Sequence, residues 1–227
     1  EDTLKKGCWS SRQALGKEWA AELINQDGSE FYVVHNGCQV GSVKWSLLGQ
    51  HNVDNALMAI ASAHHAGVTL PDAIDALSHF KNVKRRMEIK GNVDGITVYD
   101  DFAHHPTAIA TTLDGLRKKV GHARILAVLE PRSNTMKMGV HKDTLAGAWH
   151  QADEVFLFEP SDMDWSLSLA VAHSETPTHC FNNIENIVQA LVDTAQDGDH
   201  ILVMSNGGFG GIHSQILSAL SAREQKA

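Results

Sequence analysis

The chain has 227 residues, of which 43% are hydrophobic and 20% are charged, and its formal net charge at pH 7 is -8. This hydrophobic fraction is enough for a folded core, so the composition argues against a disordered chain. The negative charge, without any long basic run, argues against nucleic acid or an anionic membrane as the main partner.

The cysteines and the N-terminal sequence bear on cellular location. Cys8, Cys38 and Cys180 are odd in number, far apart and outside any C-x-x-C pattern. They indicate reduced thiols of a cytoplasmic protein rather than a disulfide framework or a zinc site. The sequence shows neither a signal peptide nor an apolar stretch long enough to span a membrane. Because it also lacks an initiator Met, we expect a fragment of a longer protein.

The first third of the chain predicts a hairpin followed by two helices. Residues 1–23 are mixed and suggest no element. Strand-like runs at 30–34 and 39–45 flank Asn36-Gly37, a dipeptide that tolerates positive φ in hairpin turns. A helix opens within 47–55 and ends at Gly67, and Pro71 starts a second helix over 72–80. Residues 81–90 are charged without a clear period, and we place a domain boundary there.

From residue 91 onward the pattern alternates between strands and helices. Such βαβα order predicts the α/β class, with a mainly parallel, doubly wound sheet. The carboxyl ends of parallel strands meet at one edge of a sheet, where ligands bind, so residues 100–101, 130–132, 159–160 and 205–207 should share that edge. Predicted strands are 96–99, 124–129, 154–158, 178–181 and 200–205; predicted helices are 107–119, 142–151, 184–194 and 212–223.

The polar cluster that follows residues 96–99 is the strongest sign of function. Two carboxylates, Asp100 and Asp101, precede two imidazoles, His104 and His105, and then Pro106 fits the first turn of a helix. Four adjacent titratable groups exceed what a helix cap needs, although a capped turn is the alternative interpretation.

Two more clusters suggest nucleotide binding. At helical spacing, His51 shares a face with Asn55, and Asn52 lies one turn before Asn55. An Asn amide can complement a purine edge, and the alternative interpretation is that Asn52 caps the N-terminus of the helix. Arg85 and Arg86 lie at the proposed domain boundary. The arginine fork suits phosphate oxygens, but a solvated charge run is the usual explanation for such a cluster.

Two loops after predicted strands suggest anion binding. The loop at 130–135 combines Arg132 with small hydrogen-bonding side chains that could hold a carboxylate, or it is an ordinary turn. The glycine-rich loop at 205–213 lets backbone amides approach an anion, but it lacks the third glycine of a dinucleotide fingerprint.

Taken together, these motifs resemble the Mur ligase family. The resemblance covers nearly the whole chain and rests on residues 49–56, 85–88, 99–107 and 130–137. It implies that residues 1–85 are the C-terminal part of a central ATPase domain. Residues 86–227 would then form the peptide-binding, Rossmann-like C-terminal domain.

The resemblance also implies roles for individual residues. The implied catalytic residues are Arg86, Asp101 and His104. ATP would be bound by His51, Asn52, Asn55, Arg86 and Asp101. The peptide substrate would be bound by His104, His105, Arg132, Ser133, Asn134, Thr135, Asn206, Gly207 and Gly208. We expect Asp100, Asp101 and Arg132 to line one crevice, with Arg86 above it from the connecting segment.

The implied reaction is the ATP-dependent joining of UDP-N-acetylmuramate to L-alanyl-γ-D-glutamyl-meso-diaminopimelate through an acyl phosphate, in bacterial peptidoglycan recycling. The cofactors would be ATP and Mg²⁺, with the Mg²⁺ ligands, the P-loop and the UDP site in N-terminal domains that this chain lacks. We therefore expect no metal site here and no activity of the fragment alone. Two alternatives are a family member that adds free L-alanine and a non-catalytic peptide-binding module.

Overall fold

The structure is a computed structural model that describes residues 14–224, and Cys8 lies outside this range. The chain divides into two compact units. The first unit runs up to Ser46 and includes Gln50–Lys81. The second unit comprises Leu47–Gly49 and the chain from Asn82 onward. Within the described range, no helix is long and apolar enough to cross a membrane.

The first unit packs two helices on a three-stranded antiparallel sheet. The strands β1 (Trp19–Leu23), β2 (Glu30–His35) and β3 (Cys38–Lys44) lie in that order, and the turn at Asn36-Gly37 has positive φ at both residues, as its sequence predicts. The helices α2 (Gln50–His65) and α3 (Leu70–Ser78) bury a shared core with the sheet. Strand β1 was not predicted, because most of its residues are only partly buried and give no clear alternation.

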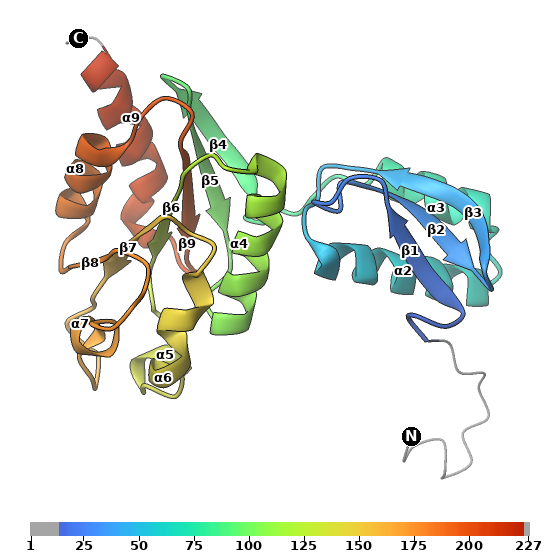
Figure 1. Ribbon diagram of the computed structural model, residues 1–227, viewed down its shortest axis with the longest axis horizontal. Coiled ribbons are helices and arrows are strands. Elements are labelled where there is room, and N and C mark those ends of the chain that lie inside the picture. The colour runs from blue at the N-terminus through green and yellow to red at the C-terminus, as the bar shows by residue number, and fades with distance from the viewer. Residues whose placement is uncertain (1–13, 225–227) are drawn as a thin grey trace. The chain divides into compact units, whose positions relative to one another are not determined.

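The second unit contains a six-stranded, mainly parallel sheet, which confirms the predicted fold class (Figure 1). The strand order is β4-β5-β9-β6-β7-β8, and only β4 runs antiparallel to its neighbour. Strand β4 falls partly in the segment where no element was predicted; as an edge strand it buries neither face fully. The strand bounds are β4 (Glu88–Val93), β5 (Ile96–Asp101), β6 (Ile125–Leu129), β7 (Glu154–Phe158), β8 (Thr178–Phe181) and β9 (His200–Met204).

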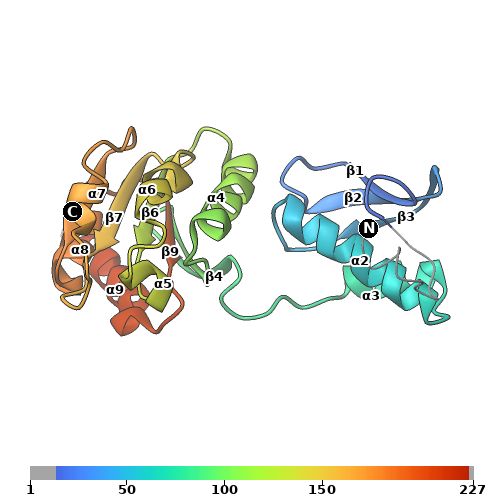
Figure 2. The same ribbon diagram turned by 90° about the horizontal axis from the view of Figure 1, so that it is seen from below.

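Helices cover both faces of this sheet (Figures 1 and 2). One face packs against α4 (Pro106–Val120) and a set of short helices, and the other packs against α8 (Ile184–Thr194) and α9 (Ile212–Glu224). The single helix predicted over 142–151 is wrong, since only residues 142–145 are α-helical and they continue into a glycine-containing 3-10 turn over residues 146–149. The short elements are α5 (Asn134–Lys137), α6 (Lys142–Leu145), η1 (Ala146–Trp149), α7 (Leu167–Ala170) and η2 (Phe209–Gly211).

The position of β9 brings three distant segments together. The last strand of the chain lies between β5 and β6 and is parallel to both. At the carboxyl edge, the amide of Ser205 donates to the carbonyl of Asp101 at 3.1 Å, and the amide of Glu130 donates to that of Met204, also at 3.1 Å. Glu159 directly follows β7, which is parallel to β6, so the predicted sharing of one sheet edge by residues 100–101, 130–132, 159–160 and 205–207 is confirmed.

Candidate functional site

Asp101 holds the backbone together at the end of β5. Its side chain is 3% exposed, and its carboxylate accepts hydrogen bonds from the amides of Ala103 at 2.8 Å and Met87 at 2.9 Å, and from the Thr112 hydroxyl at 3.4 Å. Burial raises the pKa of Asp101, and the amides of Ala103 and Met87 oppose that shift. The carboxylate therefore fixes the segment before β4 against the turn that leads into α4.

Asp100 is also buried, and its partners are cations. The Nε atom of Arg85 lies 3.4 Å from each carboxylate oxygen of Asp100, and the same guanidinium donates to the carbonyl of Ser205. On the other side, Nε2 of His213 lies 3.3 Å from an Asp100 oxygen. That contact lacks hydrogen-bond geometry, so this buried nitrogen has no hydrogen-bond partner within the described chain. Burial lowers the pKa of His213, and the Asp100 charge opposes the shift.

Within the described chain, Asp100 and Asp101 do not line the expected crevice, because Asp100 is only 5% exposed and Asp101 is 3% exposed. The two adjacent arginines lie in different environments. Arg85, for which no separate role was predicted, reaches Asp100, whereas Arg86 is exposed. Both guanidinium groups lie over the ring of Phe102, at 5.3 Å for Arg85 and 5.8 Å for Arg86.

The backbone around Arg85 explains this division of roles. Arg85 has a φ of 61° and Met87 a φ of 51°, values in the left-handed region that is costly for residues with a side chain. Hydrogen bonds hold this conformation: Glu88 accepts from the Arg85 amide at 2.9 Å, and the Asn82 amide group donates to the Arg86 carbonyl at 2.6 Å. The bond from the Arg85 amide lowers the pKa of Glu88. The sequence carries no sign of these φ values.

His104 stands at the start of the loop that enters α4. Its Nδ1 atom lies 2.9 Å from the carbonyl oxygen of Phe102. A carbonyl can only accept, so Nδ1 carries the hydrogen and Nε2 is the basic nitrogen of the neutral ring. His105 instead packs against His141, with ring centroids 4.1 Å apart. Burial, followed by the neighbouring His141, lowers the pKa of His105.

The loops after β6 and β9 meet beside these residues. The Ser205 hydroxyl donates to the Glu130 carboxylate and accepts from the amide of Gly207 at 2.9 Å. The exposed Arg132 side chain crosses Gly207 so closely that a Cβ atom at position 207 would lie 2.3 Å from Nη1 of the arginine. The structure therefore brings Arg132 to the glycine-rich loop.

The remaining predicted peptide-binding residues, after those before α4, lie in the same two loops. Ser133 is the N-cap of α5 and accepts from the Met136 amide at 3.4 Å, and its hydroxyl lies 3.2 Å from that of Thr135. Asn134 is exposed at the start of α5. A side-chain oxygen of Asn206 is buried without a hydrogen-bond partner within the described chain, and Gly208 is exposed.

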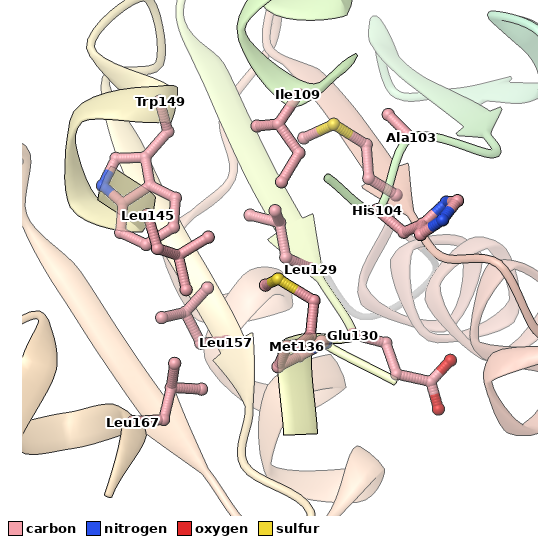
Figure 3. A pocket seen from close by; sticks show the side chains of 12 residues that line it. Ala103, His104, Ile109, Leu129, Glu130, Met136, Leu145, Trp149, Leu157 and Leu167 are labelled. Atoms are coloured by element: carbon pink, nitrogen blue, oxygen red, sulfur yellow. The ribbon is translucent and has the colours of Figure 1, made fainter. Parts of the chain in front are cut away.

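An apolar cavity of about 10 Å³ lies behind this edge of the sheet. Figure 3 shows the apolar side chains on one side, with the imidazole of His104 and the carboxylate of Glu130 directed away from them. We call this space the apolar cavity. Its lining side chains are Ala103, His104, Ile109, Leu129, Glu130, Pro131, Met136, Leu145, Trp149, Leu157, Leu167 and Met204.

The remaining predicted residues lie in the first unit, at the start of α2. His51 and Asn55 are exposed there and Asn52 is half-buried. Within residues 14–224 there is no group of three or more His, Cys, Asp or Glu residues arranged to hold a metal ion.

Comparison with known proteins gives a consistent result. The family described as Mur ligase, glutamate ligase domain, matches residues 85–207. Among curated proteins, the chain is similar to two UDP-N-acetylmuramate–L-alanyl-γ-D-glutamyl-meso-2,6-diaminoheptandioate ligases. The Haemophilus influenzae protein is 55% identical over 98% of this chain and 50% of its own length. The Escherichia coli K12 protein is 51% identical over 100% of this chain and 50% of its own length.

The similarity extends to a solved structure. A murein peptide ligase from Psychrobacter arcticus is 44% identical with a TM-score of 0.71, over 97% of this chain and 48% of that one. The chain thus spans about half the length of the curated relatives that it matches.

Proposed function

Because this chain belongs to the Mur ligase family, we propose that it is the C-terminal half of an ATP-dependent ligase that joins UDP-N-acetylmuramate to L-alanyl-γ-D-glutamyl-meso-diaminopimelate. Residues 1–85 would complete a central ATPase domain, and residues 86–227 would form the domain that receives the peptide. The names of the two relatives that match the whole chain support this substrate pair. The reaction would take place in the bacterial cytoplasm, and the half chain alone would be inactive.

On the nucleotide side, Arg86 is the residue that we propose to face the ATP phosphates. Its side chain is exposed and its guanidinium lies over Phe102, while Asn82 and Asp101 bind the peptide group between Arg86 and Met87. A persistent cation on an anchored backbone suits phosphate oxygens. Asp101 is buried, so it would act by holding the segment that carries Arg86. His51, Asn52 and Asn55 would contact the adenine end.

The observation that carries the proposal is the 2.9 Å contact between Nδ1 of His104 and the carbonyl oxygen of Phe102. The Nδ1–H of His104 is committed to the Phe102 carbonyl, which leaves Nε2 as the basic nitrogen at the carboxyl edge of the sheet. An amine nucleophile must lose a proton as it attacks, and a neutral imidazole is suited to accept it. Arg132 and the loop around Gly207 would hold a peptide carboxylate nearby, together with Ser133, Asn134, Thr135, Asn206, Gly208 and His105.

The proposed chemistry has two steps. An oxygen of the lactyl carboxylate of UDP-N-acetylmuramate attacks the γ-phosphorus of ATP, which breaks the bond to ADP and forms an acyl phosphate. The peptide amine then attacks the acyl carbon, the bond to inorganic phosphate breaks, and the amine proton leaves through His104. Mg²⁺ would assist the first step, and we propose that its ligands lie in the missing N-terminal domains. Within this chain, positioning and charge stabilisation are the main contributions.

The test is a ligation assay on the full-length protein with UDP-N-acetylmuramate, ATP and Mg²⁺. Two amines are offered separately, the tripeptide and free L-alanine, and products are identified by mass spectrometry alongside ADP release. We expect a muramyl tripeptide product. Product with free L-alanine only would assign the chain to an alanine-adding ligase. No ligation, combined with calorimetric tripeptide binding to this chain that ATP does not affect, would indicate a binding module.

A further inference from the structure

The apolar cavity has the size of a single small group. A volume of about 10 Å³ is roughly what one water molecule needs, and a methyl group is of similar size. Apart from His104 and Glu130, its lining side chains are apolar, and cavities of that kind stay dry. A methyl group that entered would gain contacts with the wall without displacing ordered water.

The two polar lining residues differ from the rest in exposure. Ile109, Leu145 and Leu167 of the wall are at most 1% exposed, whereas His104 and Glu130 are both half-buried. The polar ends of these two side chains point away from the apolar set (Figure 3). The cavity therefore combines an apolar interior with an imidazole and a carboxylate at its rim.

We propose that the apolar cavity receives the side-chain methyl group of the amine-bearing first residue of the acceptor peptide, and thereby limits that residue to the size of alanine. This inference rests on the proposed function. In alanine the methyl carbon and the amine nitrogen are bonded to the same Cα. A methyl group at the inner end of the cavity therefore leaves the amine at the rim. There the Glu130 carboxylate attracts the ammonium form, and Nε2 of His104 accepts its proton.

The size of the cavity sets the expected selectivity. A glycine in the first position leaves the cavity empty and loses the burial of one carbon, which is worth about four-fold in kcat/KM. An L-2-aminobutyrate residue adds one methylene that the cavity cannot hold. Discrimination of one methylene by an apolar pocket is about ten-fold or more.

The experiment measures kcat/KM on the full-length ligase with three acceptors that differ only in the first residue: glycine, L-alanine or L-2-aminobutyrate. Leu145→Ala enlarges the cavity. Leu116→Ala is the matched control, because Leu116 is equally buried in the same core but does not line the cavity. Ile109→Val, a lining substitution with a smaller cost in stability, covers the case in which Leu145→Ala does not fold.

We expect Leu145→Ala to raise the aminobutyrate-to-alanine ratio of kcat/KM about ten-fold, with a smaller rise for Ile109→Val and no change for Leu116→Ala. Unchanged ratios in both lining variants would overturn the inference, as would an equal rise in the control. If the wild-type enzyme ligates the L-alanyl peptide but the two lining variants keep the wild-type selectivity, only the cavity assignment is refuted. A wild-type enzyme that ligates none of the three peptides refutes the proposed function itself.

Discussion

The buried contacts of Arg85 lead to a prediction about stability that separates it from its neighbour. Replacing Arg85 by Ala removes the guanidinium from Asp100 and from the Ser205 carbonyl, which leaves an Asp100 side chain that is 7% exposed beside His213. Breaking a fully buried ion pair costs about 3–5 kcal/mol, and a hydrogen bond to a charged group contributes about 1.5–3 kcal/mol.

The Arg85 side chain is 29% exposed and its distances to Asp100 are long, so the expected loss lies below the fully buried case. We expect Arg85→Ala to lower the free energy of unfolding by about 2–3 kcal/mol, equivalent to a fall in Tm of about 4–12 °C for a unit of this size. Arg85→Gly should recover about 1 kcal/mol of that loss, because glycine adopts a φ of 61° without strain.

Scanning calorimetry of the whole chain is the assay, and Arg86→Ala is the matched control. Arg86 is exposed, and its cation–π contact with Phe102 contributes about 0.5–1 kcal/mol. In a ligation assay of the full-length protein the two variants should rank the other way round, because Arg86→Ala is expected to abolish ligation while the fold stays intact. Equal Tm values for the two variants would refute the anchoring role of Arg85, and near-normal turnover of Arg86→Ala would remove Arg86 from the mechanism.

Three further predictions concern protonation, hydrogen bonding and the peptide loop. Because burial lowers the pKa of His213, the unfolded chain binds a proton first, and stability should fall as pH drops from about 6.5 towards the folded-state pKa; His213→Gln should flatten that part of the pH–stability curve measured by urea unfolding. Asp101→Asn should lower the free energy of unfolding by about 1–3 kcal/mol, because one amide hydrogen-bond donor then faces a backbone donor; unchanged urea midpoints would contradict this. Gly207→Ala should displace Arg132 and raise the KM for tripeptide with little change in Tm, whereas Gly147→Ala, which meets open space outside the predicted peptide-binding set, should leave that KM unchanged.

Much of the second unit could be predicted because its strands are buried on both faces. The runs at 125–129 and 201–204 are apolar throughout, which is typical of the inner strands of a parallel sheet, and the intervening amphipathic helices fix the βαβ order. Polar residues after such strands must lie at one edge, so most of the candidate site could be located before its geometry was known.

What the sequence could not predict depends on long-range contacts. Edge strands such as β4 bury little, so their pattern is weak. The choice between Arg85 and Arg86 depends on a positive φ that other segments hold in place. Glu130 acquires a partner only through Ser205, which lies 75 residues further along the chain. Neither the contact of Arg85 nor the partner of Glu130 has a local signal in the sequence, because the spacing of residues does not encode the order of strands in a sheet.

The strand order also determines when the site can form. Strands β5 and β6 are separated by β9, so neither reaches its final pairing until residues 200–204 are in place. The same strand delivers Ser205, whose carbonyl accepts from Arg85 and whose hydroxyl donates to Glu130. The arginine segment before β4 and the carboxylate after β6 are thus joined through one residue near the end of the chain. Since non-local pairings of this kind form slowly, we expect the site to be completed only when the centre of the sheet closes.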